Sequence, residues 1–330
     1  MLSSNFLEVQ TFLAVFLDEY LALLYVMFLA AVHATEMSWD RIMAKFAQQH
    51  FEETPAAGDQ PVTPGVWTIA RMNRLPEREK RAIYASFIPP ALLAKFGMRP
   101  ETLCAQADEQ LFICQCPPRS SAVRLELRHV PDFPDPIFLL EMRDTSFGDI
   151  EILFVNINNP FAERFEIDRD ENGNSTGFGT LCRNIPEEIR AMRAGLAPGQ
   201  VRSGLRMYRA FLAQVHAFCR QFGICRVKAE AFAYHNAIMH EFYGFRYITG
   251  QTMMEEIDRE FAPGGVLFKR LDGSTPFRQA GFERSIKGRS WAIHDGILGC
   301  RWECPRMYHL IEATDTRGRE AFTCHLLRVP

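Results

Sequence analysis

Glycines and arginines gather between residues 199 and 209, where the residue types suit the binding of an anion. The hydrophobic pattern predicts a long helix over 199–223, with Gly223 as its C-terminal cap. The first turn of a helix has unpaired N–H groups, glycine lets an anion approach them, and arginine adds positive charge. The residues that we assign to this anion site are Gln200, Val201, Arg202, Ser203, Gly204 and Arg206. The alternative interpretation is a solvated basic face on an amphipathic helix.

Polar, aromatic and turn-forming residues also gather in segments 271–278 and 288–296. Because functional residues are common on loops, we expect a substrate pocket there. Its candidate members are Asp272, Arg278, Arg289, His294 and Asp295. His294 suggests proton transfer, but we expect a strand at this point, on which His294 and its neighbour would point to opposite faces.

A metal site is a second hypothesis for the same region. The candidate ligands are His294, Cys300, Cys304 and His309. Zinc ligands usually occur in tighter CxxC or HxxxH pairs, so we expect no bound metal. The nine cysteines are odd in number and irregular in spacing, which favours reduced, buried thiols. No nucleophile elbow, P-loop or HExxH motif occurs in the sequence.

The elements that must position these residues divide the chain into two regions. Residues 1–110 are expected to be helical, with helices at 5–34, 39–51, 76–86 and 88–96. Residues 111–330 are expected to form an α/β body that ends in a turn-rich extension with short strands. Strands are predicted at 111–116, 122–130, 136–143, 149–157 and 224–233, and helices at 186–193, 199–223 and from 234 to a break at Gly244. This order predicts a mixed sheet, partly parallel, with flanking helices.

Composition and charge narrow the class of protein. Apolar residues make up 47% of the chain and charged residues 23%, the balance of a soluble globular protein. The net charge of −3 argues against a dedicated nucleic-acid binder. Residues 21–32 are an apolar run, but Asp18 and Glu19 precede it and residues 1–10 lack the basic residues of a signal peptide. We expect a buried or interface helix in a cytoplasmic protein, with membrane contact as the less favoured alternative.

The stretch 199–250, GQVRSGLRMYRAFLAQVHAFCRQFGICRVKAEAFAYHNAIMHEFYGFRYITG, resembles the central part of the GNAT family, the Gcn5-related N-acyltransferases. That family has a loop of the form [QR]-x-x-G-x-[GA] before a long helix, then a strand, then a helix that contains Asn and ends near Tyr and Gly-Phe. Here Asn236 and Gly244 follow that pattern, whereas Val201 and Arg206 replace two loop residues. The altered loop is similar to that of synthases of N-acyl amino acids and homoserine lactones, which take acyl chains from a carrier protein.

The resemblance implies an N-acyltransferase that moves an acyl group from acyl-CoA or an acyl-carrier protein to an amine of a small molecule or amino acid. No tightly bound cofactor is implied. The donor would lie along residues 200–204 and reach Asn236, with its arm between two splayed parallel strands. We assign proton removal from the amine to Glu230, with His294 as a further catalytic candidate, and protonation of the leaving thiolate to Tyr243. Two alternatives stay open, a non-catalytic module that binds an acyl or phosphate ligand and a metal-dependent enzyme.

Overall fold

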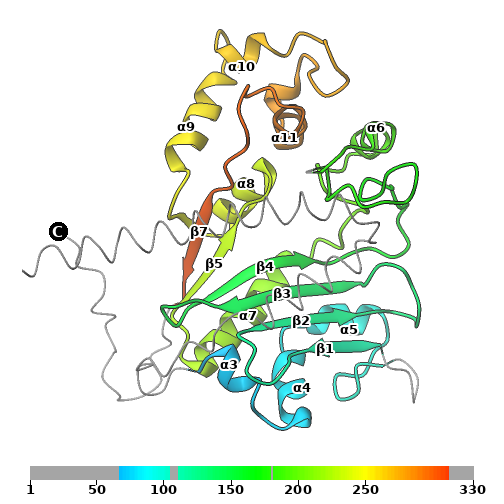
Figure 1. The fold of residues 1–330 in the computed structure, drawn as a ribbon, viewed down its shortest axis with the longest axis vertical. Helices are drawn as coiled ribbons and strands as arrows, with labels where there is room; N and C mark the ends of the chain where they lie inside the picture. Colours follow the sequence, from blue (N-terminus) through cyan, green and yellow to red (C-terminus); the bar gives the residue numbers. More distant parts are fainter. Residues whose placement is uncertain (1–66, 105–110, 180, 312–330) are drawn as a thin grey trace, which may run out of the picture.

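The chain forms a seven-stranded mixed sheet with helices packed around it (Figure 1). The computed structural model describes residues 67–104, 111–179 and 181–311, so the helices predicted at 5–34 and 39–51 lie outside the described residues. The strands are β1 (Phe112–Gln115), β2 (Ala122–Leu127), β3 (Phe138–Asp144), β4 (Ile150–Asn156), β5 (Arg226–Glu230), β6 (Arg246–Tyr247) and β7 (Arg306–Leu310). The helices are α3 (Ile69–Met72), α4 (Glu77–Ala85), α5 (Pro90–Lys95), α6 (Ile185–Arg193), α7 (Tyr208–Phe222), α8 (Tyr234–Phe242), α9 (Gln251–Glu260), α10 (Val266–Lys269), the 3-10 helix η1 (Phe282–Arg284) and α11 (Ile286–His294).

Alternation of apolar and polar residues gives the sheet one buried face and one polar face. Leu125 of β2 lies opposite Leu140 of β3 on the buried face, whereas Arg124 and Glu141 form an ion pair on the other. A slip of one residue would bury these charges, which fixes the register. The strand order is β1-β2-β3-β4-β5-β7-β6, with β4 and β5 parallel and all other neighbours antiparallel. The predicted α/β class and its parallel pair are therefore confirmed.

Helix α7 packs against the buried face of the sheet. The last four residues of the predicted apolar stripe in this helix, Leu212, Val215, Cys219 and Phe222, are buried. The helix ends at Gly223, whose φ of 71° is the left-handed conformation of a C-terminal cap. Phe218 of α7 contacts Phe87, with ring centroids 4.2 Å apart. Residues 67–104 and the sheet thus share one hydrophobic core.

Backbone pairing between β4 and β5 is short. It runs from Ile150 and Val227 to Ile152 and Ala229, and no further pair joins the two strands among the described residues. β4 nevertheless continues to Asn156. In Figure 1, β1–β4 run across the view while β5 and β7 turn away from them. The last residues of β4 are therefore free of β5.

A bulge interrupts β4 where its pairing with β5 ends. Glu141 of β3 pairs with Phe154, but the next residue, Met142, pairs with Ile152. Leu153 is thus an extra residue, and a bulge of this kind bends a strand and changes the direction of its backbone groups.

The segment between β6 and β7 is helical, which corrects the expectation of turns and short strands. In α9, Met254 and Ile257 are buried, and Phe261 follows one turn later, so the apolar spacing is that of a helix. Ser285 caps the N-terminus of α11, and its hydroxyl accepts a hydrogen bond from Gly288 N. Helices α9, α10 and α11 occupy the top of Figure 1, with α6 at the upper right. Within the described part of the chain, no helix has both the length and the apolar character required to cross a membrane.

Candidate functional site

Helix α7 begins at Tyr208, so the prediction of a helix from residue 199 is wrong. The physical reason is that Arg202 is buried and its guanidinium donates to Asp135 at 2.7 Å and to the carbonyl of Ala162 at 2.5 Å. Val201 is buried in a second apolar cluster with residues of α6 and α11. This loop is a packed connection, and Arg202 is not available to an anion.

Gln200 and Ser203 are also engaged in this connection. The side-chain oxygen of Gln200 accepts a hydrogen bond from Ala197 N at 2.8 Å, and the carbonyl of Ser203 accepts one from Asn159 N at 3.0 Å. The first turn of α7 therefore contains none of the four residues from Gln200 to Ser203 that we assigned to it.

The residues just before α7 lie in space beside the residues that follow β4, although α6 separates the two elements in the chain. Gly204 forms an isolated β-bridge with Asn158, and Leu205 N donates to the carbonyl of Ile157 at 3.0 Å. Within residues 67–104, 111–179 and 181–311 no side chain caps this helix, so its first N–H groups have no side-chain partner there. Arg206 and Arg209 are exposed beside this turn, and among the described residues neither forms an ion pair. Gly204 and Arg206 of the predicted anion site lie near this start, but they too precede the helix.

Arg206 also has an unusual backbone. Its φ of 58° is left-handed, a conformation that is uncommon and costly for residues other than glycine. Such strain persists only where the surrounding structure imposes it, as the bridge at Gly204 and the helix start do here.

The C-terminal end of helix α8 contacts the start of α7. The hydroxyl of Tyr208 lies 3.0 Å from His240 Nδ1, and the ring of Tyr208 lies 5.0 Å from that of Tyr243. Burial lowers the pKa of His240 to about 4, so this imidazole is neutral at pH 7. The structure thus brings the predicted acid, Tyr243, to the helix start, while Asn236 lies at the opposite end of α8.

A second group of polar residues joins α6 to α11. Glu188 is buried, and its Oε1 lies 3.1 Å from His294 Nε2. Arg183 donates to both Glu188 and Asp295, at 2.9 Å each, and Arg278 donates to Asp295 at 2.8 Å. Three of the five predicted pocket residues are therefore brought together. His294 and Asp295 belong to a helix end and not to a strand, and a shared arginine network links them.

Electrostatics keep Glu188 ionised in this group. Burial alone would raise its pKa, but the hydrogen bonds from His294 and Arg183 outweigh burial and lower it. An ionised carboxylate can only accept a hydrogen bond, so Nε2 of His294 carries the proton that is donated to Glu188. The other ring nitrogen, Nδ1, is then the basic atom of this imidazole. The arrangement can accept a proton from a substrate.

The sequence did not reveal Glu188 or Arg183 as site residues. Glu188 is on the inner side of α6 with Ala191, which is a position where an apolar residue is expected. A carboxylate at a helical position that should be buried was the available signal, because such a group requires a partner.

Two neighbouring residues, Phe178 and Gly179, lie between the Glu188–His294 pair and the free end of β4. Phe178 stacks on Phe154 of β4, with ring centroids 6.4 Å apart. The next residue, Gly179, has a φ of 88°, and a Cβ at this position would lie 2.6 Å from His294 Cε1. A side chain at this position would clash with the imidazole, so glycine allows the backbone of residue 179 to pack directly against His294.

Glu230 occupies the last position of β5 and is half-buried. Burial, and then the charge of Glu151, raise its pKa, while a hydrogen bond with Cys304 and the nearby Arg306 oppose this. A carboxyl group with a raised pKa is suited to general base catalysis near neutral pH. The structure therefore contains two candidate bases, Glu230 and His294.

Of the other two predicted pocket residues, Asp272 lies near Arg278, and Arg289 lies on a different side of α11. Hydrogen bonding to Ser274, and then the charge of Arg278, lower the pKa of Asp272. Asp272 accepts a hydrogen bond from Ser274 N at 2.9 Å in an exposed turn. Arg289 pairs with Asp258 of α9 at 2.6 Å. Neither residue forms a hydrogen bond or ion pair with His294 or Asp295 in the described part of the chain.

The proposed metal ligands are dispersed. His294 binds Glu188, Cys304 contacts Glu230, and His309 stacks on His216. Residues 67–104, 111–179 and 181–311 hold no group of three or more His, Cys, Asp or Glu side chains placed for a metal ion.

Comparisons with known proteins add no family to this description, since no protein-family model, no curated protein and no solved structure matches the chain.

Proposed function

We propose that the protein is a GNAT-type N-acyltransferase of the cytoplasm that moves an acyl group from acyl-CoA or an acyl-carrier protein to an amine of a small molecule or amino acid. The observation that carries this proposal is the early end of the β4–β5 pairing, at Ile152 and Ala229. The resemblance to GNAT enzymes implies that the acyl arm lies between two splayed parallel strands. The bulge at Leu153 and the open start of α7 lie at the same end of β4 and support this assignment.

The start of α7 is the proposed site for the anionic part of the donor. Its free N–H groups and partial positive charge attract a phosphate, and Arg206 and Arg209 add two guanidinium groups. Because Gly204 and Leu205, just before α7, pair with Asn158 and Ile157, just after β4, a phosphate bound at the helix start would direct the rest of the donor along the free end of β4.

The proposed reaction needs one base and one acid. The amine nitrogen attacks the thioester carbonyl, so that a C–N bond forms and the C–S bond breaks. Nδ1 of His294 takes the proton of the amine, since Nε2 is engaged by Glu188. Backbone N–H groups of β4 beyond Ile152 would stabilise the oxyanion, and Tyr243 would protonate the leaving thiolate. Glu230 is the alternative base.

The test follows free thiol release from acyl-CoA and acyl-carrier protein thioesters across a panel of amines. We expect amine-dependent release, and His294→Asn should reduce kcat about 100-fold or more. Glu230→Gln addresses the alternative base, and Glu303→Gln, at an exposed position, is the matched control. If Glu230→Gln reduced kcat by that amount and His294→Asn left kcat unchanged, the base would be Glu230 and not His294.

Absence of thiol release with every donor and amine would contradict the proposal. Donor binding without release would instead favour the non-catalytic binding module, for which the altered loop of the GNAT pattern is the supporting observation.

A further inference from the structure

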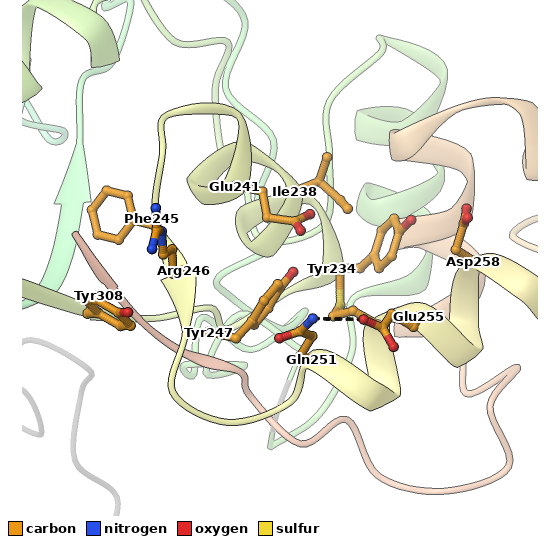
Figure 2. Close-up of a pocket in the computed structure, with 11 residues that line it drawn as sticks. Tyr234, Ile238, Glu241, Phe245, Arg246, Tyr247, Gln251, Glu255, Asp258 and Tyr308 are labelled. Carbon is orange, nitrogen blue, oxygen red and sulfur yellow. Dashed lines mark hydrogen bonds between the residues drawn. The ribbon is translucent and has the colours of Figure 1, made fainter. Parts of the chain in front are cut away.

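A pocket of about 580 Å³ lies between α8, β6, α9 and β7 (Figure 2). That volume is typical of small-molecule sites, which span about 300–1,000 Å³. The residues that line it are Tyr234, Ile238, Glu241, Phe245, Arg246, Tyr247, Gln251, Met254, Glu255, Asp258 and Tyr308. None of them belongs to α7, β4 or α11, whereas α8 contributes to this pocket and also ends at Tyr243, the proposed acid.

The lining of the pocket combines aromatic faces with carboxylates. Tyr234 and Phe245 are buried, and Tyr247 and Tyr308 are half-buried. Figure 2 shows the carboxylate of Glu241 close above the hydroxyl of Tyr247, with Tyr234 beside them. Aromatic faces next to carboxylates attract organic cations, because the ring quadrupole and the negative charge act in the same direction.

Two of the three carboxylates have no cationic partner among the described residues. Asp258 is neutralised by Arg289, at 2.6 Å. Glu255 accepts a hydrogen bond only from the neutral amide of Gln251, at 2.8 Å. Glu241 interacts with the hydroxyl of Tyr247, and burial together with this carboxylate raises the pKa of that tyrosine.

Arg246 is the single cationic residue in the lining, and Figure 2 places it at the opposite end from Asp258. Arg289 also reaches this pocket, where it donates to the Tyr234 hydroxyl at 3.3 Å, but Asp258 offsets its charge. Glu241 and Glu255 therefore leave the part between Tyr234, Tyr247 and Glu255 with a net negative charge and an aromatic wall.

We propose that this pocket binds a protonated organic amine, with the ammonium group at Glu241 and Glu255 and its apolar body against Tyr234 and Tyr247. An ammonium ion has no free lone pair for attack on a thioester. The inference therefore concerns binding of the protonated amine, and its test measures affinity and not transferase activity.

The experiment is isothermal titration calorimetry of the full chain with three probes of similar size. These probes are the cation phenethylammonium, the neutral 3-phenylpropan-1-ol and the anion 3-phenylpropanoate. We expect the cation to bind at least about tenfold more tightly than the alcohol, and the anion to bind most weakly. Equal affinities for the three probes, or no binding of the cation at millimolar concentration, would overturn the proposal.

Variants locate the site. Glu241→Gln and Glu255→Gln should each weaken binding of phenethylammonium about five- to tenfold, while Glu256→Gln, an exposed residue of α9 outside the lining, should leave it unchanged. All three side chains are exposed, so the variants are expected to keep the thermal midpoint of the parent chain. An equal loss of affinity in Glu256→Gln would show a non-specific effect of charge and contradict the assignment.

Discussion

At the scale of single residues, the polar groups of this protein are held by buried partners. The hydroxyl of Tyr208 and Nδ1 of the neutral His240 imidazole share a hydrogen bond, and Glu188 fixes the imidazole of His294. Buried groups of this kind couple protonation to stability, because the folded chain and the unfolded chain have different proton affinities.

His240 is predicted to make the protein sensitive to acid. Burial depresses its pKa from 6.5 to about 4, so the unfolded state takes up a proton first as the pH falls. The contribution to stability is complete above pH 6.5 and is lost between 6.5 and 4, by about 3 kcal/mol. Denaturant unfolding at a series of pH values should therefore give a shallower pH dependence for His240→Gln than for the parent chain.

Comparing the variant with the parent removes the contributions of other groups. Asp144, for example, has a pKa that burial raises to about 6, so its effect on stability has the opposite sign. Identical pH profiles for the parent and His240→Gln would contradict the assigned role of His240.

Gly179 is predicted to control the geometry of His294. In Gly179→Ala the new methyl group would meet the imidazole, and its φ of 88° would be strained. We expect thiol release to fall about tenfold or more with little change in donor affinity, measured as kcat against donor Kd. Gly173→Ala is the control, because its φ is also positive but no atom lies within 4 Å of the added carbon. Full activity in Gly179→Ala would show that the imidazole is not required in this position.

At the scale of elements, the start of α7 separates two arginines that the sequence placed on one helix. Arg202 precedes the helix and is paired inside the protein, whereas Arg209 is exposed in the first turn. We therefore expect Arg202 to contribute to stability and Arg209 to contribute to donor binding.

Arg209→Ala is predicted to weaken donor binding about three- to tenfold, with unfolding free energy unchanged. Arg220→Ala, in the last turn of α7, is the matched control. Arg202→Ala should instead destabilise the fold, because it removes a buried partner of Asp135. The loss should be limited to about 2 kcal/mol, because Asp135 keeps a second partner in Arg164. Calorimetric titration with the donor and denaturant unfolding measure the two effects, and a loss of donor affinity in Arg202→Ala alone would reverse the assignment.

Local patterns in the sequence predicted most of the sheet and the apolar stripe of α7, because alternation and helical spacing are local properties. The position of the helix start was not predictable in this way. It depends on Asp135, which is distant in sequence and holds Arg202 outside the helix. The pairing of Glu188 with His294 joins segments 106 residues apart, and no local pattern contains that contact. Of the residues named from the sequence, His294, Asp295, Tyr243 and Glu230 belong to the candidate site described above.

At the scale of the whole molecule, the helices before β1 belong to the same core as the sheet. Phe87 contacts Phe218, and Trp67 N donates to the carbonyl of Phe222 at 3.0 Å. The described residues of the region 1–110 are therefore expected to unfold together with the sheet.

Phe87→Ala is predicted to lower the unfolding free energy by about 3–5 kcal/mol, because it removes a fully buried ring from this shared core. The loss should appear in one cooperative transition, with far-UV circular dichroism and tryptophan fluorescence coinciding. Phe147→Ala, at an exposed position, should change stability by less than about 0.5 kcal/mol. Two separate transitions would show that the early helices and the sheet are independent units.

The order of the strands also has a consequence for synthesis on the ribosome. β7 lies between β5 and β6 in the sheet, yet it follows β6 in the chain by nearly 60 residues of helical insertion. Until Leu310 has left the exit tunnel, β5 has an unsatisfied edge and β6 has no neighbour. A nascent chain stalled before this point would expose a strand edge that recruits chaperones or other chains, whereas β1–β4 could already be paired.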